Sequence, residues 1–183
     1  MSFLFRQKAR AVFPLVAVLL GLGGCAYMTP GQPEPPPLPA LAKPAPFTAA
    51  DAAFVQKLNA MDLTQTALAN SAKTHAGRSD LALLAATIAK DLTDVQAQLA
   101  KLAAAHTLTL TGQPTAVDQK QITRMQHMQG AVFDKRYIRA FTTAHARIKP
   151  VLASQIAHSK DPEVVKIARD VQTRLATYQA AMK

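Results

Sequence analysis

The sequence contains a single cysteine, Cys25, in 183 residues. One thiol can form neither an internal disulfide bond nor a thiolate metal cluster, so both kinds of stabilisation are excluded. Glycine is also scarce, because only three of the seven glycines lie beyond residue 47. Scarce glycine together with abundant alanine, leucine and glutamine favours helix throughout this part of the chain.

The sequence also lacks an apolar run long enough to cross a membrane. Its apolar stretch at residues 11–22 is twelve residues long and contains Pro14, whereas a spanning helix needs about 20. Basic residues precede this stretch, and two glycines and Cys25 follow it, which is the order of a secretory signal. We therefore predict a bacterial lipoprotein signal peptide at residues 1–24, with Cys25 acylated by chains such as palmitate. A simple transmembrane anchor is the alternative, which the short length disfavours.

The residue after the predicted lipidation site indicates whether the protein is kept in the inner or the outer membrane. Ala26 follows Cys25, at the position where an aspartate would retain a lipoprotein in the inner membrane of a Gram-negative cell. We expect the periplasmic side of the outer membrane, with the membrane as a partner through the lipid anchor. Acyl chains contribute about 0.8 kcal/mol per buried methylene, so more than one chain makes a stable anchor.

Proline is concentrated in one segment, since eight of the twelve prolines fall between residues 30 and 46. Such a segment favours polyproline II at about 3.1 Å per residue, so residues 26–46 could extend roughly 65 Å from the membrane. We interpret it as a spacer; a ligand at Pro33–Pro39 for a proline-recognition module is the alternative. The expected organisation is a signal at 1–24, a lipidated tether at 25–46 and a helical domain at 47–183.

Capping signals divide the domain into helices. Thr48 with Asp51 and Thr115 with Asp118 form capping pairs, and Asp161 followed by Pro162 is a further start signal. Gly77 and Gly130 are expected to close the first and third helices. Thr107–Thr111 alternates like a strand but has no partner, so it is expected to be an extended linker. The expected helices span residues 48–75, 79–106, 116–129, 131–159 and 162–182.

The four long expected helices predict an all-α fold. Each would be about 30 to 42 Å long and has one apolar face, which a four-helix bundle satisfies. The connection at 107–129 contains the short helix and is long enough to cross the bundle, as in ferritin-like topologies. We predict a ferritin-like four-helix bundle with an additional short crossover helix, and an up-down-up-down bundle is the alternative.

The fourth expected helix carries a family signature. Gly130-Ala131-Val132-Phe133-Asp134-Lys135-Arg136-Tyr137, followed by His145, resembles the Gly-Ala-x-Phe-Asp-x-x-Tyr signature and downstream histidine of a bacterial envelope family. The family consists of exported or outer-membrane proteins without an assigned function. The resemblance covers about residues 51–182 and implies a ferritin-like bundle.

The resemblance also implies positions that could ligate a metal. The family carries a glutamate in the first helix, an Asp-His pair in the second and histidines in the last two. In this chain those positions hold Gln65, Asp91 with Leu92, His145 and Tyr178. The metal-ligand-like positions are therefore partly lost, and His145 is the retained imidazole.

Helical periodicity gives an independent reason to place His145 inside the bundle. At 100° per residue, Asp134 and His145 share the face of Phe141 and Leu152. We predict an inward-facing polar cluster, in which His145 is either a hydrogen-bonded core residue or a weak metal ligand. A di-iron centre needs several carboxylates and Glu-x-x-His pairs, and the helices contain one glutamate and no such pair. The cluster comprises Gln65, Asp91, Asp134, Tyr137, His145 and Tyr178.

The charge balance is strongly basic. The chain has 21 Lys and Arg against 11 Asp and Glu. Three of the basic residues lie in the predicted signal peptide. Export excludes nucleic acid as an expected partner and favours an anionic envelope polymer or an envelope protein. A solvated charged face is the alternative interpretation. The candidate anion-binding residues are Lys135, Arg136, Arg139, Arg147 and Lys149.

These patterns predict a lipid-anchored envelope protein without enzymatic activity. No nucleophile triad, phosphate-binding loop or paired glutamates are visible, so neither catalysis nor a cofactor is expected. The first hypothesis is a structural or interaction module of the envelope. The alternative is a metal-responsive or stress-protective module with a reduced site around His145.

Overall fold

The computed structural model describes residues 46–183. The predicted signal peptide at 1–24, the lipidation site Cys25 and the spacer up to residue 45 lie outside the described residues. Residues 46–183 lie within one compact unit, which has its own hydrophobic core. The helical domain can therefore be treated as a folding unit of its own.

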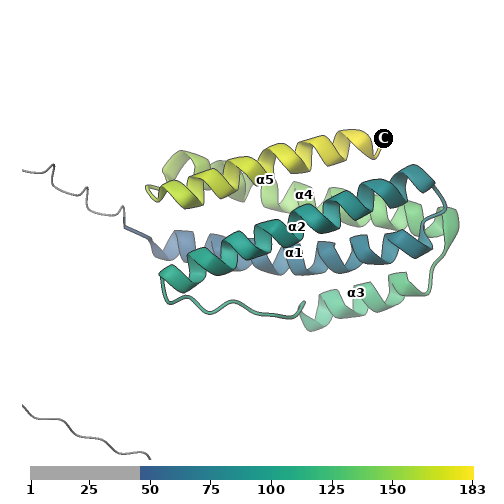
Figure 1. The fold of residues 1–183 in the computed structure, drawn as a ribbon, viewed down its shortest axis with the longest axis horizontal. Coiled ribbons are helices and arrows are strands. Elements are labelled where there is room, and N and C mark those ends of the chain that lie inside the picture. Colours follow the sequence, from purple (N-terminus) through teal and green to yellow (C-terminus); the bar gives the residue numbers. More distant parts are fainter. Residues whose placement is uncertain (1–45) are drawn as a thin grey trace, which may run out of the picture. The chain divides into compact units, whose positions relative to one another are not determined.

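Within residues 46–183 the chain is entirely helical, as predicted, with five helices and no strand. None of these helices is long and apolar enough to cross a membrane. In Figure 1 four long helices lie side by side, and a short one lies against them. The helices are α1 (Ala49–His75), α2 (Ser79–Ala105), α3 (Ala116–Gln126), α4 (Gly130–His158) and α5 (Pro162–Ala181).

The N-terminal caps predicted for the first, third and last helices are present. Thr48 and Asp51 form a reciprocal capping box, in which the Asp51 carboxylate accepts from the Thr48 backbone N–H at 2.8 Å. The Asp161 carboxylate accepts from the first N–H groups of α5, with Pro162 as its first residue. The Thr115 hydroxyl likewise accepts from the third residue of α3. These side chains satisfy amide groups that lack partners within their helices.

Two glycines act differently from the prediction. Ala76, with φ −67° and ψ 138°, caps α1 in an extended conformation, so Gly77 does not close that helix in a left-handed turn. A Cβ at Gly77 would lie 2.9 Å from the Gly130 backbone, so this glycine permits a close approach of two segments. Gly130 has φ +60° and begins α4, while α3 ends earlier than expected, at Gln126.

Contacts at the helix ends establish the directions of the helices. Asp134 at the start of α4 contacts Gly77 after α1, and Gln155 near the end of α4 donates to the Ala50 carbonyl. His106 after α2 lies 3.6 Å from Asp161 before α5. Hence α1 and α4 are antiparallel, α2 and α5 are antiparallel, and α2 runs in the direction of α4. The connection at 106–129 therefore crosses the length of the helices.

The core lies between the four long helices, and α3 packs outside it on α1 and α4. Each long helix contributes one apolar face, and burial of each large side chain stabilises the fold by about 1.5 to 3 kcal/mol. Only Ile122 and Met125 of α3 are buried. The short helix thus covers one side of the α1–α4 pair. The largest fully buried side chains are Tyr137, Phe54, Phe133 and Phe141.

Candidate functional site: a basic groove between α1, α3 and α4

Two residues of the predicted polar cluster form a pair between α2 and α5. The Tyr178 hydroxyl donates to the Asp91 carboxylate, and Arg174 Nη1 lies 3.1 Å from the other Asp91 oxygen. Burial, followed by the hydrogen bond to Asp91, raises the pKa of Tyr178 to about 12. Tyr178 and Arg174 of α5 both bind the carboxylate of Asp91 on α2, so this group of three side chains joins the two helices.

Asp134 has a separate role at one end of the domain. Its two carboxylate oxygens accept from the backbone N–H groups of Gly77 and Arg78, at 3.0 and 3.1 Å. Arg78 is the N-cap of α2 and makes no side-chain cap of its own. The carboxylate therefore fixes the α1–α2 turn and places negative charge at the positive end of α2.

The other three residues of the predicted cluster are buried. Tyr137 is fully buried, and its hydroxyl has no hydrogen-bond partner among the described residues, so burial raises its pKa. His145 is 8% exposed, yet within residues 46–183 no hydrogen bond or ion pair connects it to the other five. Gln65 is buried as well. The six residues thus lie in the interior or at its edge without one shared hydrogen-bond network.

The structure gives little support to the hypothesis that His145 binds a metal ion. Among residues 46–183, no three His, Cys, Asp or Glu side chains are grouped so that they could hold a metal ion. The alternative that His145 is a weak metal ligand therefore has no ligand set in the described part of the chain to support it.

Asp62 of α1 is a buried carboxyl group that the sequence analysis missed. It is completely buried, and neither carboxylate oxygen has a hydrogen-bond partner within the described residues. Burial raises the pKa of Asp62 well above its ordinary value, which favours the neutral carboxyl. Its position four residues after Leu58 and seven before Ala69, both buried, was a usable signal.

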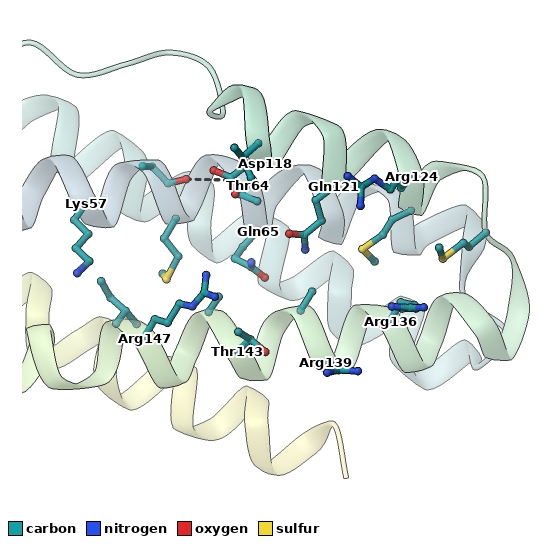
Figure 2. Close-up of a pocket in the computed structure, with 18 residues that line it drawn as sticks. Lys57, Thr64, Gln65, Asp118, Gln121, Arg124, Arg136, Arg139, Thr143 and Arg147 are labelled. Atoms are coloured by element: carbon teal, nitrogen blue, oxygen red, sulfur yellow. Dashed lines mark hydrogen bonds between the residues drawn. The ribbon is translucent and has the colours of Figure 1, made fainter.

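A groove of about 640 Å³ opens between α1, α3 and α4 (Figure 2). α3 and α4 lie on either side of the groove, and α1 lies between them at its base. This volume lies within the range of about 300 to 1,000 Å³ typical of small-molecule sites. The groove exists because the crossing connection holds α3 against the α1–α4 pair.

The charges along this groove are mostly positive. Only one acidic residue, Asp118, lines it, and its carboxylate already accepts from the Thr115 hydroxyl at 2.6 Å. The ion pairs found within residues 46–183 involve none of the cations of the groove. Their donors remain available for an anionic ligand. These cations, called here the groove cations, are Lys57, Arg124, Arg136, Arg139 and Arg147.

The basic residues predicted on α4 divide into two sets. Arg136, Arg139 and Arg147 line the groove, whereas Lys135 and Lys149 of the same helix do not. Lys57 and Arg124 were missed, because they come from α1 and α3. Nothing in their local sequence signals a site, and only the packing of α3 brings them to α4.

Cations lie toward both ends of the groove, an uncharged polar side chain lies between them, and apolar side chains complete the lining. In Figure 2, Lys57 and Arg147 lie toward one end, Arg124 and Arg136 toward the other, and Gln65 lies between them. Gln65 is 4% exposed, and its Oε1 has no partner within the described residues. The apolar lining includes Met61, Met125, Met128 and Ile148.

Fold and site together define an all-helical, bundle-like protein with a cationic groove on one side. The sequence profile of the family described as "Domain of unknown function (DUF4142)" matches residues 36–183, so the chain belongs to this family. Membership in a family of unknown function was predicted and is confirmed. No curated protein and no solved structure matches the chain. Function must therefore be argued from the groove itself.

Proposed function

We propose that this protein is a lipoprotein anchored through Cys25 on the periplasmic side of the outer membrane. Its helical domain serves as a non-enzymatic interaction module that binds an anionic component of the envelope. The signal-like residues 1–24, the lone cysteine and the proline-rich spacer support the location. The groove supports the binding role.

We further propose that the four long helices are a four-helix bundle of the ferritin-like class. The parallel direction of α2 and α4 supports this, since a crossing connection between the second and third long helices distinguishes that topology from an up-down-up-down bundle. The polar interior differs from a di-iron centre, because Asp134 and Asp91 are engaged in structural contacts. Binding at the surface groove is the better supported role.

One observation carries the binding proposal: five cations line a single groove with one acidic residue. Like charges placed together repel one another in the free protein, and an anion relieves that repulsion. Arginine guanidinium groups also match phosphate and carboxylate oxygens with paired donors. The remaining lining consists of amides, hydroxyls and apolar groups, which suits binding.

The proposal can be tested with the soluble chain of residues 26–183, which contains the whole compact unit and omits the lipidated cysteine. Co-sedimentation is measured with vesicles of phosphatidylcholine alone and with vesicles that also contain phosphatidylglycerol. The double variant Arg139→Gln/Arg147→Gln neutralises two groove cations. The matched variant Lys135→Gln/Lys149→Gln removes the same charge from the same helix outside the groove.

We expect binding only to the anionic vesicles, weakening with salt. The groove variant should lose about tenfold or more in affinity, since each basic residue near an anionic surface contributes about 1 kcal/mol. The matched variant should lose much less. Equal losses in both variants, or equal binding to neutral vesicles, would contradict a groove that selects anions.

A further inference from the structure

We infer that the ligand of the groove is a phosphate-bearing amphiphile, in which one anionic headgroup is joined to an apolar chain. An extended polyanion is the ligand that this inference excludes. It rests on the proposed function and deepens it by naming the ligand class. The groove's apolar lining, its unpartnered acceptor and its volume each support the inference.

The apolar lining of the groove would remain unused by a ligand that carries only charge. Met61 and Met128 are partly buried and pack against the core, while Val117 on the α3 side is 77% exposed. Methionine side chains are flexible and polarisable, so they adapt to an apolar chain of varied shape. A chain laid along these side chains would remove apolar surface from water.

The polar groups of the groove suit a headgroup that both carries charge and donates a hydrogen bond. Lys57 of α1 and Arg147 of α4 lie toward the same end of the groove, and the Arg147 side chain reaches toward Gln65 (Figure 2). In the middle of the groove, the buried Oε1 of Gln65 accepts from no described residue and therefore calls for a donor. A phosphate monoester that carries one proton supplies oxygens for the cations and a P–O–H donor for this amide oxygen.

The volume of the groove distinguishes an amphiphile from a bare ion. About 640 Å³ is far larger than one phosphate requires, and α3 lines the space from Val117 to Met125. A headgroup at the cations leaves room beside the methionines, and an apolar chain fills that room. Phospholipids and free alkyl phosphates share this chemistry.

Calorimetric titration of the chain of residues 26–183 tests the inference with four probes. Dodecyl phosphate, used below its micelle concentration, carries both features. Dodecyl maltoside has the same chain on a neutral headgroup, inorganic phosphate has the charge without a chain, and long-chain polyphosphate is an extended polyanion. We expect one dodecyl phosphate per chain, bound about tenfold or more tightly than any other probe.

Two variants separate the apolar contact from the charges. Met61→Gln keeps the length of the side chain but makes it polar. It should weaken the binding of dodecyl phosphate severalfold and leave the binding of polyphosphate unchanged. Leu83→Gln is the matched control, because Leu83 is 72% exposed on α2 and does not line the groove. Thermal unfolding of each variant verifies that the fold is retained.

The outcomes distinguish this inference from the proposed function. If polyphosphate binds more tightly than dodecyl phosphate and Arg139→Gln/Arg147→Gln reduces its binding, the ligand class is wrong and the anion-binding role stands. If dodecyl maltoside binds as well as dodecyl phosphate, the groove is merely apolar and the inference is overturned. If no anionic probe binds, the inference and the proposed function both fail.

Discussion

At the scale of single residues, Asp62 places a carboxyl group inside an apolar core without a hydrogen-bond partner among residues 46–183. Its pKa is higher in the folded than in the unfolded state, so the folded state holds its proton to a higher pH. The stability associated with this proton is fully present below the unfolded value of 3.8. It declines as the pH rises through the folded pKa.

We therefore predict that Asp62→Asn stabilises the domain at pH 8 and has a smaller effect at pH 4. An amide cannot ionise, so the variant avoids the cost of burying a charge, and the free energy of unfolding at pH 8 should rise by about 1 kcal/mol or more. Urea unfolding followed by circular dichroism at both pH values measures the difference. Asp170→Asn, an exposed aspartate of α5, is the control. An unchanged pH profile in Asp62→Asn would show that Asp62 does not titrate as described.

The family signature at the start of α4 can be explained residue by residue. Gly130 adopts a positive φ, Phe133 and Tyr137 are fully buried, and Asp134 binds the α1–α2 turn. Periodicity predicted the inward direction of Asp134 and His145. It could not predict the partner of Asp134, because that partner is a pair of backbone amides more than 50 residues away. The motif is a structural element at the end of the domain.

At the scale of helices, Asp134 couples three elements through two hydrogen bonds. We predict that Asp134→Ala lowers the free energy of unfolding by about 2 to 3 kcal/mol, because it leaves two backbone N–H groups without their charged acceptor. Asp134→Asn retains one acceptor oxygen and should cost about half as much. Urea unfolding at neutral pH compares the two variants. Equal stability of Asp134→Ala and the parent chain would mean that water replaces the carboxylate without loss.

The sequence predicted helix starts better than helix ends. Caps at Thr48, Thr115 and Asp161 depend on contacts within three residues, so local sequence specifies them. α1 ends at His75 as expected and α3 ends three residues early, at Gln126, but neither helix is closed by a glycine, because Gly77 and Gly130 meet each other across the fold. Such a contact depends on tertiary packing, which no local pattern encodes.

The residues of the groove were likewise predictable only where they depend on local sequence and not on tertiary packing. The cations of α4 were predicted from their density, but the distinction between Arg147 and Lys149 depends on which face α3 covers. α3 is short and buries only Ile122 and Met125, so few of its residues indicate which face docks on the other helices. Its docking position could not be derived from the sequence, and two groove cations were missed for that reason.

At the scale of the whole molecule, charge and proposed attachment act together. A lipid anchor would confine the domain near a membrane surface, where the local concentration of an anionic amphiphile is high. Under that arrangement a groove of modest affinity is sufficient for occupancy. The spacer would set how far from the surface the groove can reach, since proline-rich chain is extended and semi-rigid.

This arrangement depends on acylation at Cys25, which yields the last prediction. Cell fractionation with a palmitate label should place the parent protein in the outer membrane, carrying the label. Cys25→Ser should lose the label, because a hydroxyl cannot replace the thiolate as the nucleophile that is alkylated. Ala26→Asp should keep the label and move to the inner membrane, whereas the matched Ala26→Ser should remain in the outer membrane. A labelled Cys25→Ser variant, or a mature chain that retains residues 1–24, would show that the anchor lies elsewhere, and the proposed groove ligand would then have to reach the domain from solution.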